Sequence, residues 1–184
     1  PQVVDVIHPE GRDIVESFEE RMLLDAQSWG RLLDSEPAIT PYMDIRLRNS
    51  IDLYEDFVYT LFKNNMVDFT DDPIDIVTPF FVAKKDGRLR LVWDCRVTNR
   101  RFSSAPAISM PSGTTWGSLD IPQDEQLYVA QSDIKDYFYS LGIVSTLGRY
   151  FCLPPVRATT LKRWNVTAPS RQGKTWPFLR VVPM

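Results

Sequence analysis

The stretch Ile76-Val-Thr-Pro-Phe-Phe-Val-Ala-Lys-Lys-Asp-Gly-Arg-Leu-Arg-Leu-Val-Trp-Asp-Cys-Arg96 is the most informative part of the chain for its fold. Two runs typical of β-strands, residues 80–85 and 88–93, flank the dipeptide Asp86-Gly87. A two-residue Asp-Gly loop favours a type I′ turn, in which both central residues have positive φ. The stretch therefore predicts a β-hairpin whose register pairs Lys85 with Arg88 and Phe80 with Trp93.

In that register the hairpin has two different faces. One is apolar and is expected to pack on a core; it consists of Phe80, Val82, Leu89, Leu91 and Trp93. The other gathers Lys85, Arg88 and Arg90 near the tip, with Lys84 at its edge. Such a cluster suits phosphate binding, because Lys supplies a mobile point charge and Arg a planar fork of donors. The alternative is a charged hairpin that only keeps the protein in solution, since charge runs are usually solvated faces.

A second informative stretch follows about 30 residues later. Leu127 to Asp133 is a short apolar run that ends in a carboxylate, and residues 136–141 have the character of one or two helical turns. A carboxylate between a buried strand and a helix is suited to hold a Mg²⁺ ion that also bridges phosphates. Alternatively, Asp136 is the N-cap of the helix. The spacing of Asp133 and Asp136 alone does not define a metal site.

Taken together, several blocks resemble the fingers and the first palm motif of reverse transcriptases, especially those of retroviruses and long-terminal-repeat retrotransposons. They occur in the family's order between residues 76 and 184 and comprise residues 78–96, 99–101, 132–139, 149–153 and 176–184. The resemblance implies an α+β fold, namely a partial right-hand polymerase with fingers and the start of the palm. The fingers and partial palm would occupy residues 76–184. An acidic helical N-terminal segment, residues 1–75, would precede them.

The resemblance also implies a catalytic role for one carboxylate. Asp133 corresponds to the first metal-binding aspartate, and the backbone carbonyl of Ile134 would face the same metal, which is Mg²⁺ or Mn²⁺ in the complete enzyme. Arg149 to Leu153 resembles the strand that follows this motif. Phe69-Thr-Asp-Asp72 is one spelling of the family's catalytic hairpin, but it precedes Asp133 and runs into Pro73. We therefore interpret it as an acidic turn.

Further residues correspond to positions that bind the incoming nucleotide. Asp136 and Tyr137 would lie beside its triphosphate, and Phe138 would be the steric gate that crowds a ribose 2′-OH. Arg90 and one of Lys84 or Lys85 would hold the triphosphate, and the sequence leaves both lysines open. The candidates for contacts with an RNA or DNA template-primer are Arg88, Arg96, Arg100 and Arg101.

The implied activity is template-directed nucleotidyl transfer to a primer 3′ end by a two-metal mechanism that needs three carboxylates. Of these, only Asp133 has a counterpart among the 184 residues, because the family's Tyr/Phe-x-Asp-Asp motif would follow Met184. The sequence is therefore expected to be a fragment of an RNA-directed DNA polymerase that is inactive alone. The alternative is a non-catalytic nucleic-acid-binding or interaction module.

The net charge of −3 conceals two oppositely charged halves. Residues 1–75 carry 17 acidic and 6 basic side chains, whereas residues 76–184 carry 7 acidic and 15 basic ones. The basic half, with a net charge of +8, suits contact with a phosphate backbone. The acidic half, with −11, is expected to pack against it.

Composition limits the remaining possibilities. With 43% hydrophobic residues and no long uncharged apolar run, the chain is expected to be a soluble intracellular protein with no membrane partner. Cys95, Cys152 and His8 are its only cysteines and histidine, and they support neither a zinc site nor a disulfide framework. Apolar periodicity predicts helices over about residues 12–33 and 47–62. The Ser-, Pro- and Thr-rich residues 102–126 are expected to form a long connection, and residues 154–175 an irregular basic loop.

Overall fold

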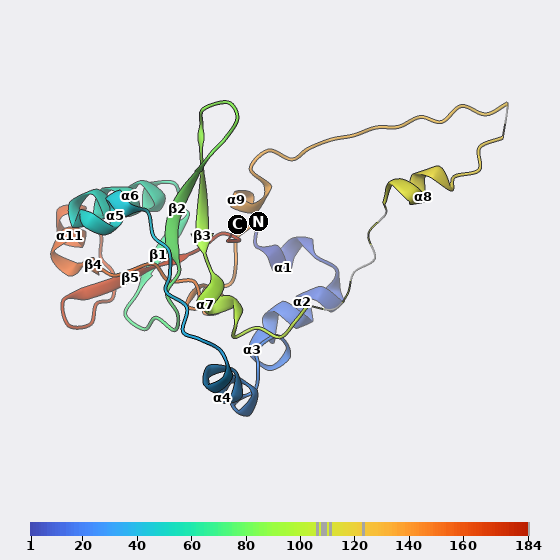
Figure 1. Ribbon diagram of the computed structural model, residues 1–184. Coiled ribbons are helices and arrows are strands. Elements are labelled where there is room, and N and C mark those ends of the chain that lie inside the picture. Colours follow the sequence, from blue (N-terminus) through green and yellow to red (C-terminus); the bar gives the residue numbers. More distant parts are fainter. Residues whose placement is uncertain (106, 108–109, 111, 123, 184) are drawn as a thin grey trace. The chain divides into compact units, whose positions relative to one another are not determined.

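The computed structural model describes residues 1–105, 107, 110, 112–122 and 124–183 (Figure 1). The chain forms two units. The larger comprises Pro1–Ser103 and Asp136–Met184, and the smaller comprises Ser104–Lys135. In the smaller unit the described residues include one short helix, α8 (Gly113–Gly117). The coarse prediction of a mixed helix and strand protein with antiparallel sheets is confirmed.

The predicted helix over residues 12–33 is broken into shorter pieces. The N-terminal part contains α1 (Val3–Val6), α2 (Pro9–Glu16), α3 (Phe18–Arg21) and α4 (Ala26–Ser35). Between α3 and α4, Leu23 bridges Phe102 and the Leu24 N–H donates to the Arg101 carbonyl at 2.7 Å. Asp25 then caps α4, because its side chain accepts a hydrogen bond from the Ser28 N–H at 2.8 Å. Contacts with residues far along the chain therefore override the helical periodicity.

The predicted helix over residues 47–62 is present, with one break. It consists of α5 (Ile45–Asn49) and α6 (Ile51–Lys63), and the Ser50 hydroxyl between them accepts a hydrogen bond from the Leu53 N–H at 3.2 Å. On α6, the apolar spacing places Tyr54, Val58 and Leu61 in the core, as the sequence predicts.

A three-stranded antiparallel sheet joins the two halves of the sequence. Its order is β1 (Val67–Thr70), β5 (Lys174–Leu179) and β4 (Val156–Arg157). The strand β1 comes from the acidic segment, so both sequence halves contribute to one sheet. Asp71 forms a bend directly after β1, and Asp72 and Pro73 continue it without regular structure, which agrees with the interpretation of an acidic turn.

In the basic half, one loop prediction and one strand prediction are wrong. Residues 154–175 are ordered as β4, then α11 (Ala158–Arg163), then a tight turn that leads into β5. Residues 149–153, which follow the short helix α10 (Ser145–Gly148), form no strand. In this stretch only Cys152 makes isolated bridges, to Ile76 and Phe178. The turn at Gln172 and Gly173 lets the chain fold back so that Val156 pairs with Thr175 and Arg157 with Lys174.

The predicted hairpin exists as β2 (Thr78–Ala83) and β3 (Leu89–Asp94), but its register differs by one residue. Ala83 pairs with Leu89 and Phe80 with Val92, and the Lys84 N–H donates to the Arg88 carbonyl at 2.7 Å. The loop therefore has three residues, 85–87, of which only Gly87 has positive φ, at 80°. Asp86 instead accepts the Arg88 N–H at 3.0 Å through its side chain. The two-residue type I′ prediction is wrong, because Asp-Gly also suits this longer loop.

The one-residue shift exchanges the faces of one strand relative to the other. Phe81, Leu91 and Trp93 share the face toward the core, where Phe81 meets Phe57 of α6 edge to face with ring centroids 5.8 Å apart. The opposite face carries Phe80 and Val82 and, nearer the tip, Lys84, Arg88 and Arg90. The prediction that Phe80 and Val82 face the core is therefore wrong, and Phe81 takes that place on β2.

Ion pairs connect the acidic segment to the basic half, as predicted. Glu36 lies 2.9 Å from Arg100 and Asp75 lies 2.5 Å from Arg101, and Asp72 pairs with Arg149. These contacts neutralise part of the +8 charge from within the chain.

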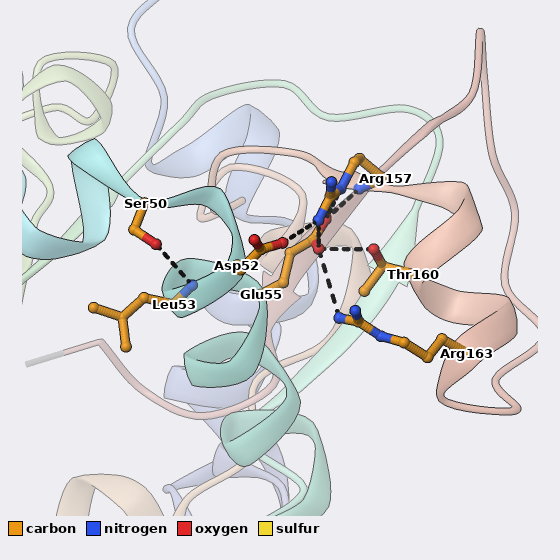
Figure 2. Close-up of polar contacts among 7 residues, drawn as sticks. All are labelled: Ser50, Asp52, Leu53, Glu55, Arg157, Thr160 and Arg163. Carbon is orange, nitrogen blue, oxygen red and sulfur yellow. Dashed lines mark hydrogen bonds and ion pairs between the residues drawn. The ribbon is translucent and has the colours of Figure 1, made fainter.

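The most buried of these ion pairs is centred on Glu55 of α6 (Figure 2). Its carboxylate is 0% exposed and accepts hydrogen bonds from the Arg157 N–H at 3.0 Å, the Arg157 guanidinium at 2.5 Å and 3.0 Å, and the Thr160 hydroxyl at 2.7 Å. Burial raises the pKa of Glu55, but the hydrogen bonds from Arg157 and Thr160 lower it by more, so the pKa lies below its ordinary value. The cluster locks α6 to β4 and α11.

No described helix of the chain combines the length and the apolar character needed to cross a membrane.

Replacing Glu55 by Gln is expected to lower the free energy of unfolding by roughly 3 kcal/mol, because Arg157 would lose its buried counter-charge. The matched control is Asp56→Asn, an exposed acid on the same helix, which should leave stability nearly unchanged. Urea unfolding monitored by circular dichroism measures both. Equal effects of the two substitutions would contradict the structural role of the cluster.

The contribution of Glu55 should also depend on pH. Because its pKa is lower in the folded than in the unfolded chain, where it is about 4.3, the contribution is complete above that pH. It disappears as pH falls through the folded value. The stability difference between the wild type and Glu55→Gln should therefore shrink on acidification, and a constant difference down to low pH would contradict it.

Candidate functional site

The cations of the hairpin tip surround a pocket. Its volume is about 370 Å³, and it is lined by Val82, Ala83, Lys84, Lys85 and Arg90. The observed register places Lys84 on the face of Arg90, while Lys85 is the first residue of the loop. Both lysines that the sequence left open therefore reach the pocket, but only Lys84 shares the strand face of Arg90.

The three cations that line this pocket form no ion pair with the described residues. Among the described residues, no carboxylate lies within 4 Å of the charged groups of Lys84, Lys85 or Arg90. Arg88 differs, because its guanidinium lies 2.7 Å from Asp86. Hydrogen bonds from Arg88 hold the pKa of Asp86 below its ordinary value. Three of the four predicted hairpin cations are thus available to an anion.

The helix α9 (Tyr137–Ser140) lies against the hairpin. Its Tyr139 hydroxyl donates to the Leu91 carbonyl at 3.2 Å, a contact across 48 residues of sequence. Burial raises the pKa of Tyr139, the charge of Asp136 raises it further, and that of Arg90 lowers it. The hydrogen bond to Leu91 therefore ties α9 to β3. The sequence analysis missed Tyr139, although it belongs to the same Asp-Tyr-Phe-Tyr block.

The other predicted nucleotide-binding residues of this block are accessible. Tyr137 and Phe138 are each 44% exposed and meet edge to face, with ring centroids 5.6 Å apart. Asp136 occupies the N-cap position of α9, as one alternative predicted, but with φ of 53° and without a capping hydrogen bond from its side chain. Among the residues that the structure describes, its carboxylate therefore has no hydrogen-bond partner that would commit it to the cap.

Asp133 and Ile134 belong to the smaller unit. Residues 127–133 form no strand there, and Leu127 and Tyr128 are 53% and 86% exposed, so the predicted buried strand is wrong. An apolar run needs a neighbouring strand to become part of a sheet, and the smaller unit provides none among its described residues. Within the part of the chain that the structure describes, no three His, Cys, Asp or Glu side chains gather around a possible metal position.

The three remaining arginines predicted to contact nucleic acid are each paired within the chain. Arg96, at the start of α7 (Arg96–Asn99), donates to both Asp94 oxygens at 2.8 and 2.7 Å, and the pKa of Asp94 falls to about 2, mainly through these hydrogen bonds. Arg100 pairs with Glu36, and Arg101 with Asp75 while lying 4.6 Å from the Trp29 ring centroid. Sequence reasoning missed these carboxylates because most of them lie far away in the chain.

A second pocket, of about 480 Å³, lies beside this arginine group. Its lining includes Tyr42, Phe80, Trp93, Asp94, Arg96 and Asn99. Trp93 is 4% exposed, and its indole N–H has no hydrogen-bond partner among the described residues. The Tyr42 N–H donates to Asp94 at 2.7 Å, so this pocket wall is rigidly tied to β3.

Comparisons of the chain with models of known protein families and with curated proteins gave no match. The assignment of a function therefore depends on the residues and on their geometry.

Proposed function

We propose that the larger unit is the nucleotide-binding part of an RNA-directed DNA polymerase, which carries out template-directed nucleotidyl transfer to a primer 3′ end. One observation carries the proposal, namely the pocket that Lys84, Lys85 and Arg90 line without an ion pair to any described carboxylate. An uncompensated group of Lys and Arg is a strong attraction for a triphosphate. The class of enzyme comes from the ordered sequence blocks that resemble reverse transcriptases.

In this proposal the hairpin and α9 hold the nucleotide from two sides. Lys84 and Arg90, on one face, contact phosphate oxygens, and the Tyr139 hydrogen bond to Leu91 fixes the position of α9. The half-exposed ring of Phe138 is then available to crowd a ribose 2′-OH. Asp136 and Tyr137 lie at the start of the same helix, and in this proposal they face the phosphates.

The complete transfer reaction needs more than these residues. Divalent metal ions activate the primer oxygen and neutralise the triphosphate in such reactions. Asp133 supplies one carboxylate, and the described residues do not complete the ligand set. We therefore propose nucleotide and template-primer binding, without nucleotidyl transfer, for a chain of these 184 residues.

A second candidate function is a non-catalytic nucleic-acid-binding module. The observation that favours it is the net charge of +8 on residues 76–184, part of which stays uncompensated at the hairpin. The two functions differ in the role of Asp133, which matters for a polymerase part and is irrelevant for a binding module.

Nucleotide binding tests the hairpin site. Lys84→Gln and Arg90→Gln should each weaken the binding of a deoxynucleoside triphosphate by roughly tenfold, because each removes a charge-assisted contact. Arg46→Gln is the matched control, since Arg46 is an exposed cation on α5. Titration calorimetry provides the affinities. A loss in Lys85→Gln without a loss in Lys84→Gln would assign the contact to the loop, and full affinity in all three hairpin variants would contradict the site.

Primer extension tests the catalytic limit. The 184-residue chain is expected to incorporate no labelled nucleotide above the background of Asp133→Ala, because one carboxylate cannot hold two metal ions. Template-primer affinity of the wild type should fall steeply with ionic strength. Incorporation above the Asp133→Ala background would contradict the limit, and an affinity insensitive to salt would contradict both candidate functions.

A further inference from the structure

A second group of cations lies away from the hairpin, on the sheet end formed by β4 and β5. Lys174 pairs directly with Arg157 across β4 and β5, and it bridges Arg171 on its other side. Directly paired residues of neighbouring strands point to the same face of a sheet. Arg157, Lys174 and Arg171 therefore form a row of like charges across adjacent strands, at intervals of about 5 Å.

The turn that builds this row is rigid. Arg171 and Lys174 exchange two backbone hydrogen bonds, of 2.8 and 3.0 Å. The two residues between them, Gln172 and Gly173, have φ of 52° and 74°, as a type I′ turn requires. The Arg171 guanidinium lies 5.6 Å from the ring centroid of Trp176, on the same face of β5. The backbone of both residues, and the side chain of Arg171, therefore have a defined position on the sheet.

Carboxylates compensate only one end of the row. Arg157 pairs with Glu55 and with Asp52, and Arg163 of α11 approaches Glu55 at 3.9 Å (Figure 2). Arg171 and Lys174 are exposed, and no carboxylate of the described residues lies within 4 Å of either.

The sequence around the row supplies no counter-charge either. Residues 137–184 contain seven Lys or Arg and no Asp or Glu. Like charges directly opposite each other destabilise a sheet pair. A bound polyanion would remove this cost between Arg171 and Lys174. If these residues only kept the protein in solution, an irregular loop would carry them without such a cost.

We propose that Arg171 and Lys174, together with the exposed part of Arg157, form a second binding surface for the phosphate backbone of RNA or DNA. This inference rests on the proposed function for its partner, but it uses residues outside the nucleotide pocket. A row of fixed cations matches a backbone with regularly spaced charges. The contact is to phosphates, so it positions the nucleic acid without selecting a sequence.

The test compares two double variants with equal loss of charge. Arg171→Gln with Lys174→Gln removes the uncompensated cations of the row, and Arg46→Gln with Arg48→Gln removes two exposed cations of α5. Fluorescence anisotropy with a labelled template-primer duplex, over a series of salt concentrations, gives the slope of log affinity against log salt. The first variant should reduce this slope by about 2, because each lost phosphate contact accounts for roughly 0.9. The α5 variant should leave the slope unchanged.

Measuring nucleotide affinity in the same variants distinguishes a failure of this inference from a failure of the proposed function. The Arg171 and Lys174 variant should bind a deoxynucleoside triphosphate as the wild type does, while the Lys84 and Arg90 variants lose it. If the hairpin variants keep nucleotide affinity but the row variant loses duplex affinity, the proposed function fails and the second surface stands.

Three outcomes would overturn the second surface. They are equal salt slopes for the two double variants, no duplex binding by the wild type at low salt, or displacement of the duplex by polyglutamate at lower concentrations than by unlabelled duplex. The last result would assign the row to an acidic protein partner. Circular dichroism of the variants confirms that each compared chain is folded.

Discussion

The buried carboxylate of Glu55 is the constraint on which the arrangement of the larger unit depends. A fully buried charge is tolerable only when donors surround it, and Glu55 receives them from the backbone and guanidinium of Arg157 and from the Thr160 hydroxyl. These donors come from β4 and α11, about 100 residues further along the chain. The position of α6 relative to the sheet is therefore specified by charge as well as by apolar packing.

This arrangement decides which cations of the basic half stay free. Arg100, Arg101, Arg149 and Arg157 pair with acids of residues 1–75, so the N-terminal segment neutralises the interior part of the +8 charge. Two groups of cations without an ion pair among the described residues lie at separate places, the tip of the β2–β3 hairpin and the turn before β5 (Figure 1). A formal charge count cannot distinguish a structural arginine from a binding one, because that depends on partners distant in sequence.

The hairpin shows how a small error in register changes a functional interpretation. The predicted two-residue loop placed Lys85 with Arg88 and Arg90, and the observed three-residue loop places Lys84 there instead. Since side chains alternate between the faces of a strand, one residue of slip moves every side chain of β2 to the other face relative to β3. Phe81 and Trp93, rather than Phe80 and Trp93, then reach the core side, where α6 receives Phe81.

The sequence by itself determined the local elements with strong signals. These are the hairpin around Asp86-Gly87, the amphipathic α6, the acidic turn at Asp71-Asp72 and the division into an acidic and a basic half. Only the tertiary structure decided the loop length of the hairpin, the break between α3 and α4, and the ordering of residues 154–175. It also decided which arginines are paired and that Tyr139 joins α9 to β3. For the break between α3 and α4, for Arg100, Arg101 and Arg157, and for Tyr139, the physical reason is that the partners lie 26 to 102 residues apart, where periodicity and turn propensity carry no information. The hairpin loop is closed locally, and there an Asp-Gly pair is compatible with more than one loop length.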